Sequence, residues 1–201
     1  DQAIEMLQRV ESQQRNNMTF FTFRWLPHSQ RLKQLLRDGY VGRVLYTEFR
    51  YLFQLPPAEP AFDWHFDPER GTGMLGRTGS HIIDMAHWLV GDIDSVAAVS
   101  KRHFDHLGKD ANGVQQLDDT MLMAVSYRNG TIGSLHFGYS VTGDGIHISI
   151  RGDEGTLEAE IVLSQGLTLR GGKAGEPLSV IAGPGDLWGE IDISQDSWGR
   201  S

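Results

Sequence analysis

Helical periodicity marks two stretches near the start of the chain, where apolar residues recur at spacings of three and four and so share one helix face. They are Ile4, Leu7 and Val10 in the first stretch, and Leu32, Leu35 and Leu36 in the second. The first helix is expected to end near Asn16 and Asn17, since asparagine tolerates the left-handed conformation found after helix ends. Gly39 supplies a stop for the second helix.

Segments rich in β-branched and aromatic residues predict strands. Residues 18–23 (MTFFTF) indicate a short buried strand, and residues 44–53 (VLYTEFRYLF) indicate a longer one. A third helix is predicted over residues 74–89, with Gly91 as its stop. Six further strands are predicted after it, over residues 96–103, 119–127, 131–139, 147–151, 156–161 and 167–170. Between the second and third of these, the residues RNG favour a tight hairpin.

This order of elements predicts an α+β domain, with an open, largely antiparallel β-sheet and helices on one face. Candidate apolar stripes on the two faces of the sheet come from Met121, Met123, Val125, Ile132, Leu135, Phe137 and Tyr139. The other face of an open sheet must also be covered. Residues 54–73 contain four prolines and predict a loop, and loops of this length are typically functional or mobile.

Composition limits the classes of function. The chain has 201 residues, enough for one substantial core, and no apolar run near the roughly 18 residues that a membrane span requires. A net charge of −8 with scattered basic residues argues against nucleic acid as a partner. The absence of cysteine excludes disulfides and thiolate chemistry. The N-terminus has no secretory signal pattern, so we expect a cytoplasmic protein.

The stretch GTGMLGRTGSHIIDMAHWLVGD, residues 71–92, places Arg77, His81, Asp84 and His87 in a glycine-led, otherwise apolar helix. A metal site on the last three is disfavoured, because ligands three apart suit a helix poorly, and no metal is expected. Two hypotheses remain open. His81 and Asp84 are hydrogen-bonded partners in a half-buried helix, or His81 is a general acid or base, a role that suits its near-neutral proton affinity.

This stretch resembles the substrate-domain helix of the Gfo/Idh/MocA family of NAD(P)-dependent oxidoreductases, which includes glucose-fructose oxidoreductase and inositol dehydrogenases. The matching positions are Gly71, Gly73, Leu75, Gly79, His81, Asp84, Leu89 and Gly91. Upstream, residues 24–51 are similar to the first helix of the family's second domain and the turn and first sheet strand after it, and downstream residues 117–139 are similar to the family's central hairpin. The resemblance covers the chain to about residue 169.

The resemblance implies two parts. Residues 1–23 would be the last helix and strand of an N-terminal dinucleotide-binding Rossmann domain, and residues 24–201 the substrate-binding and oligomerisation domain. No GxGxxG motif follows a strand in this sequence, and the family's catalytic lysine, in a Glu-Lys-Pro motif upstream, is absent. NAD or NADP would therefore be bound mainly outside this chain. The chain starts at Asp1 and is expected to be a piece of a longer protein, inactive alone.

The resemblance also implies roles for particular residues. His81 would take or give the proton of the substrate hydroxyl, with Asp84 as its support, and His87 would be a bystander. Arg24 matches a commonly basic position near the active site. Arg77 departs from the family, which usually has aspartate there. It changes the sign of the local charge and either binds a carboxylate or phosphate of the substrate or serves a plainer role.

The plainer role for Arg77 is exposure to solvent or an ion pair with Asp67 or Glu69. Both acids lie in the proline-rich loop, whose counterpart in the family lines the substrate cleft. Within that loop, Trp64 is a candidate for stacking on a sugar ring or for packing, and His65 for hydrogen bonding to a polyol.

The predicted function is therefore the substrate-binding half of an NAD(P)-dependent oxidoreductase. It would act on a hydroxyl of a sugar, cyclitol or related polyol and assemble as a homodimer or homotetramer through the sheet. The alternative is a non-catalytic ligand-binding or dimerisation module that kept this fold, with Arg77 as the mark of the lost activity.

Overall fold

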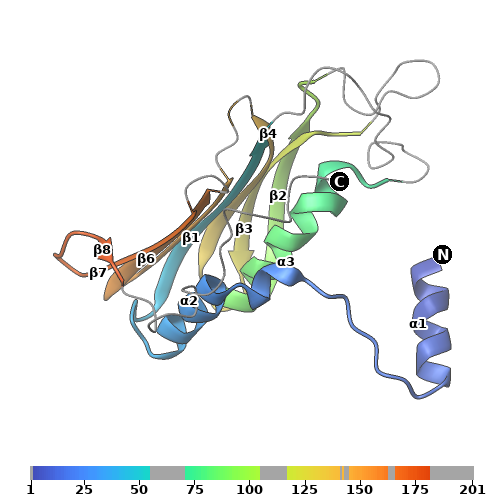
Figure 1. Ribbon diagram of the computed structural model, residues 1–201, viewed down its shortest axis with the longest axis horizontal. Helices are drawn as coiled ribbons and strands as arrows, with labels where there is room; N and C mark the ends of the chain where they lie inside the picture. Colours follow the sequence, from blue (N-terminus) through green and yellow to red (C-terminus); the bar gives the residue numbers. More distant parts are fainter. Residues whose placement is uncertain are drawn as a thin grey trace.

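The computed structural model describes residues 2–54, 71–104, 117–140, 142, 145–162 and 166–181. Its centre is one eight-stranded sheet with short helices on one side (Figure 1). The helical elements are α1 (Gln2–Ser12), the 3₁₀ turn η1 (Thr22–Trp25), α2 (Pro27–Arg37), the π-helical turn η3 (Leu75–Gly79) and α3 (Ser80–Leu89). The strands are β1 (Val44–Gln54), β2 (Ile93–Lys101), β3 (Thr120–Tyr127), β4 (Ile132–Ser140), β5 (Gly145–Gly152), β6 (Gly155–Val162), β7 (Gly166–Lys173) and β8 (Ser179–Val180).

The strand order is β2-β3-β4-β1-β5-β6-β7-β8, so β1 lies between two meanders that follow it in the chain. Each neighbouring pair of these strands is antiparallel except β1 with β4, which is parallel. The predicted hairpin joins β3 to β4, and Gly130 in its turn has φ of 86°. The predicted α+β fold with a largely antiparallel sheet is confirmed.

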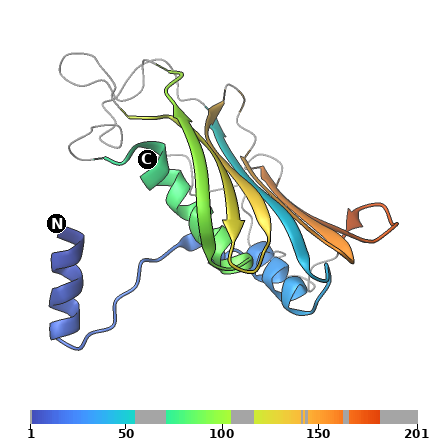
Figure 2. The same cartoon turned by 180° about the vertical axis from the view of Figure 1, so that it is seen from behind.

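The helices α2 and α3 cover one face of the sheet, here called the inner face (Figures 1 and 2). Strand side chains alternate between the two faces, so every second residue reaches this core. The largest fully buried side chains include Phe49, Phe137, Leu32, Met74 and Ile82, from both the sheet and the helices.

The predicted apolar stripes divide unequally between the faces. Their buried or core-packed members are Met121, Met123, Val125, Leu135, Phe137 and Tyr139. Ile132 instead points to the uncovered outer face and is 60% exposed.

The N-terminal segment departs from the prediction. Helix α1 lies apart from the sheet and buries none of its residues (Figures 1 and 2). It ends at Ser12, earlier than expected, and Gln14 takes the left-handed conformation with φ of 50°.

The strand predicted at residues 18–23 is wrong. Residues 16–21 have no regular structure, residues 22–25 form η1, and Met18 and Phe20 are exposed instead of buried. A strand requires a hydrogen-bonding neighbour, and none of the described strands pairs with this segment. Among the described residues, no helix is long and apolar enough to cross a membrane.

Candidate functional site

The predicted site residues that the structure describes gather at one end of the inner face. Here β1 and β4 finish, and the turn η3 runs into α3 above them. Gly73, with φ of 61°, lets the chain enter this helix sharply. The π-helical turn places Arg77, and the first turn of α3 places His81, over the strand ends.

His81 lies between aromatic rings, half-buried. Phe21 meets the imidazole edge-on at 5.4 Å between centroids, and Phe23 lies across it at 4.6 Å. Burial lowers the pKa of His81, against the opposing influence of the Asp84 carboxylate. The buried Nδ1 of His81 has no hydrogen-bond partner among the described residues. The imidazole is therefore neutral near pH 7 and has hydrogen-bonding capacity that these residues do not use.

An aromatic strip leads from His81 across the inner face. Its ring centroids are 5.7 Å apart between Phe23 and Tyr51, 4.1 Å between Tyr51 and Phe53, and 6.0 Å between Phe53 and Tyr139. Burial raises the pKa of Tyr51 to about 12, despite the nearby charge of Arg77. Tyr51 is therefore a neutral phenol that can donate a hydrogen bond.

Arg77 lies at the far end of this strip from His81. Its guanidinium donates a hydrogen bond to the Tyr139 hydroxyl at 2.9 Å, and its Cζ lies 5.9 Å from the centroid of the Phe53 ring. A cation over an aromatic face is attracted to it, so the guanidinium is held beside the strip. The site thus has an imidazole at one end and a cation at the other.

Asp84 makes a two-pronged contact with Arg24. The Arg24 Nε donates to Oδ2 at 2.6 Å, and an outer nitrogen donates to Oδ1. The Asp84 side chain is only 9% exposed, against 36% for Arg24. The guanidinium also lies 5.9 Å from the Trp88 ring. A contact of Arg24 with substrate remains a prediction, and in this structure its guanidinium binds Asp84.

His87 turns away from this group. Its Nδ1 lies 3.6 Å from a carboxylate oxygen of Asp92 near the other end of α3. Within the described residues, no three histidine, aspartate or glutamate side chains form a cluster suited to a metal ion. The helix therefore does not bring His81, Asp84 and His87 together as a ligand set.

Residues 71–76, GTGMLG, have the spacing of a dinucleotide-binding loop but not its setting. Two of their amides are already engaged, because Met74 N–H donates to the Asp118 carbonyl at 3.2 Å and Gly76 N–H to the Thr72 carbonyl at 3.2 Å. An alanine Cβ at Gly73 would come within 3.0 Å of Asp118. This turn packs against protein instead of presenting its amides to a phosphate.

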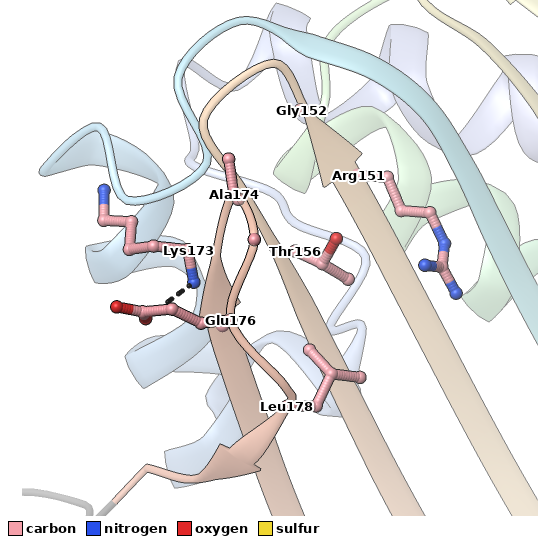
Figure 3. Close-up of a pocket in the computed structure, with 10 residues that line it drawn as sticks. Arg151, Gly152, Thr156, Lys173, Ala174, Glu176 and Leu178 are labelled. Carbon is pink, nitrogen blue, oxygen red and sulfur yellow. Dashed lines mark hydrogen bonds between the residues drawn. The ribbon is translucent and has the colours of Figure 1, made fainter.

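A separate cavity of about 240 Å³ lies at the opposite end of the sheet (Figure 3). It is lined by the ends of β5 to β7, including Arg151 and Lys173. Both cations have partners, since Arg151 pairs with Glu158 at 3.0 Å and Lys173 donates to the Tyr40 carbonyl at 2.8 Å.

The loop predictions Trp64, His65, Asp67 and Glu69 lie outside the described residues. The aromatic strip was not predicted from the sequence. The sequence feature that could have indicated it is the alternation in β1. Residues two apart on a strand share a face, so Phe49, Tyr51 and Phe53 lie in one row on the same face of the sheet. The other members of the strip, Phe23 from η1 and Tyr139 from β4, are distant in sequence, so no local pattern indicates that they join it.

The family is established by comparison with known proteins. The model of the GFO/IDH/MocA C-terminal domain matches residues 29–158, so the chain belongs to this family. Levoglucosan dehydrogenase of Pseudarthrobacter phenanthrenivorans is 28% identical over 177 residues, which cover 78% of this chain and 45% of that protein. The chain thus spans less than half the length of this relative. The predicted family is confirmed.

Solved structures share the fold. A levoglucosan dehydrogenase in complex with NADH and levoglucosan superposes with a TM-score of 0.73 at 24% identity, over 82% of this chain and 46% of that one. The WlbA dehydrogenase from Bordetella pertussis, in complex with NADH and UDP-GlcNAcA, gives 0.64 at 21% identity, over 76% and 43%. These neighbours are dehydrogenases that hold NADH together with sugars or sugar derivatives.

Proposed function

We propose that this chain is the substrate-binding part of an NAD(P)-dependent oxidoreductase that acts on a hydroxyl of a sugar or related polyol. The observation that carries the proposal is the half-buried, neutral His81 at one end of an aromatic strip. A sugar ring can stack on aromatic faces through its C–H surfaces and present hydroxyls to the polar groups at either end. Relatives and structural neighbours that act on sugars support this substrate class.

In the oxidation direction, His81 accepts the hydroxyl proton as the carbon loses hydride, and in reduction it returns the proton. A bound NAD(P) supplies the hydride acceptor or donor. The glycine turn at 71–76 does not suit the phosphates of the nucleotide, because its Met74 and Gly76 amides already donate to protein carbonyls. The nucleotide would be held by a preceding domain, to which residues 1–23 would belong. The exposed Met18 and Phe20 support such a neighbour.

The test uses the full-length protein and a panel of sugars, polyols and sugar acids, with NAD(P)H formation as the readout. Replacing a general acid or base costs about 10²- to 10⁴-fold in rate, so His81→Ala is expected to lower kcat by this factor while the ligand still binds. His87→Ala is the matched control on the same helix, and we expect it to retain turnover. The 201-residue chain alone is expected to show none.

Full turnover in His81→Ala would remove the acid–base role. Binding of a sugar by the wild-type protein without any turnover would favour the non-catalytic module, with Arg77 as a ligand-binding residue in place of the family's aspartate. The variant Arg77→Asp separates these outcomes further, because it restores the usual carboxylate.

We also propose that the chain assembles as a homodimer or homotetramer through the outer face of the sheet. Register places the exposed apolar residues Val99, Leu122, Ile132 and Tyr46 on this face. Exposed apolar residues that lie together on one face of a sheet favour burial against another subunit.

A further inference from the structure

The turn η1 docks on α3 at two neighbouring points. Residues three apart share a helix face, and on α3 these are His81 and Asp84. Phe21 and Phe23 flank the ring of His81, and Arg24 donates hydrogen bonds to the carboxylate of Asp84. One short segment therefore builds the environment of the imidazole and also binds the residue one turn after it.

The Asp84 carboxylate is engaged by Arg24 through both oxygens, and no hydrogen bond joins it to His81 in the described structure. A guanidinium fork matches a carboxylate in geometry, and charge-assisted pairs are stronger than bonds to a neutral imidazole. The orientation of the His81 ring therefore comes from the aromatic walls instead of from an aspartate–histidine hydrogen bond.

The two amide bonds that join η1 to its flanking residues, Arg24 N–H to the Phe21 carbonyl and Leu26 N–H to the Phe23 carbonyl, are both 3.4 Å long. A third contact, from the Gln30 side chain to the Arg24 carbonyl at 2.6 Å, ties the turn to α2 and not to α3. Within the part of the chain that the structure describes, the fork between Arg24 and Asp84 is a polar link between η1 and the helix that carries His81.

We propose that Arg24 is a positioning residue, whose fork on Asp84 holds Phe21 and Phe23 around His81 and so fixes the orientation and protonation of that imidazole. The inference rests on the proposed acid–base function of His81 only for its effect on turnover. Its effect on the imidazole itself is independent of catalysis.

The direction of the effect follows from the groups packed around His81. They are the rings of Phe21 and Phe23 and the Asp84 carboxylate, whose counter-ion is the Arg24 guanidinium. The phenol of Tyr51 on β1 and the guanidinium of Arg77 on η3 lie further along the aromatic strip. Loss of the Arg24 side chain would open the aromatic walls to water and leave Asp84 without its counter-ion. Both changes favour the protonated imidazole, so the pKa of His81 would rise.

The first experiment is a histidine titration by NMR in the full-length protein, with selectively labelled histidine and the His81 signal assigned from its loss in His81→Ala. We expect Arg24→Gln to raise the His81 midpoint by about one pH unit, a typical size for such environmental changes. Phe23→Leu opens the wall without touching the fork and should shift the midpoint the same way. Lys33→Gln, which removes another cation 5.6 Å from the Trp88 ring, is the matched control and should leave it unchanged.

The second experiment is the pH profile of kcat and KM. A positioning role predicts that Arg24→Gln moves the acid limb of kcat/KM upward by the same unit, with about tenfold loss well below the limb. Arg24→Lys keeps the positive charge but not the two-pronged geometry, so it should move the acid limb by less than Arg24→Gln does. An unshifted His81 midpoint together with a raised KM would overturn the inference and make Arg24 a substrate ligand. If His81→Ala is inactive but Arg24→Gln leaves the His81 midpoint unchanged, the proposed function stands and the positioning role of Arg24 is rejected.

Discussion

His28 is a buried histidine outside the candidate site. It lies in the first turn of α2, is 4% exposed, and its Nε2 lies 3.1 Å from the Ser29 hydroxyl. Burial lowers the pKa of His28 to about 4, because the charged imidazolium would lose its hydration. The folded chain therefore holds this imidazole neutral across the pH range in which an unfolded chain would protonate it.

We expect this histidine to make the folded state sensitive to acid. The unfolded chain binds a proton below about pH 6.5 while the folded chain does not until about pH 4, so stability falls as the pH drops through this window. The full effect is about 3 kcal/mol in the free energy of unfolding, at 1.36 kcal/mol per pH unit. Urea denaturation of wild type and His28→Gln between pH 7.5 and 4 measures it.

The variant should be less stable at neutral pH and should show a shallower decline toward acid pH. His81 contributes in the same direction but is present in both proteins, so it cancels in the comparison. Equal slopes in the two proteins would show that His28 does not carry the acid sensitivity.

Asp84 illustrates what the sequence revealed about single residues. The spacing of three placed it on the helix face of His81, which the structure reproduces. The sequence could not show that Arg24, 60 residues earlier, would occupy both carboxylate oxygens. Helical spacing reports which residues share a face, but the groups that arrive from another element depend on tertiary packing. Arg24 was found by family resemblance, and no local pattern indicated its ionic partner.

At the scale of elements, a composition rich in aromatic residues predicted a strand correctly for β1 and wrongly for residues 18–23. The difference is pairing. β1 lies between β4 and β5 and makes hydrogen bonds on both sides, whereas none of the described strands pairs with residues 18–23. A composition rich in aromatic and β-branched residues indicates that a segment suits a β-sheet. It does not indicate whether a neighbouring strand is available for the segment to pair with.

The junction of η3 and α3 depends on a glycine. A Cβ on Gly79 would lie 2.6 Å from two ring atoms of the buried Phe137, closer than side chains pack. Gly79→Ala is expected to destabilise the fold by about 1–3 kcal/mol through overpacking, even though alanine favours helices. Urea denaturation measures this cost.

The double variant Gly79→Ala with Phe137→Leu provides the control, because the smaller leucine side chain would relieve the contact. The two changes should therefore be less costly together than the sum of the single variants. A stabilising Gly79→Ala would show that helix and sheet do not meet at this point.

Across the whole molecule, the two faces of the sheet are treated differently. Helices cover the inner face, while the outer face leaves Val99 70% exposed and Leu122 51% exposed. These residues lie opposite each other on β2 and β3, so they form one apolar patch and not two isolated positions. Contiguous exposed patches of this kind mark interaction sites. The sequence predicted an open sheet, and the structure locates the uncovered residues.

If the outer face joins subunits, Leu122→Lys with Ile132→Lys should shift the full-length protein toward monomer. Both positions are exposed in the folded chain, so the fold should tolerate the change, but two lysines without partners would be costly in a buried interface. Sedimentation velocity over a range of concentrations measures the mass, and circular dichroism verifies that the variant is folded. Val96→Lys, on a similarly exposed apolar residue of β2 that register places on the inner face opposite the buried Val125, should retain the wild-type mass. An unchanged mass in the double lysine variant would place any subunit contact elsewhere, and a monomeric wild type would remove the assembly proposal.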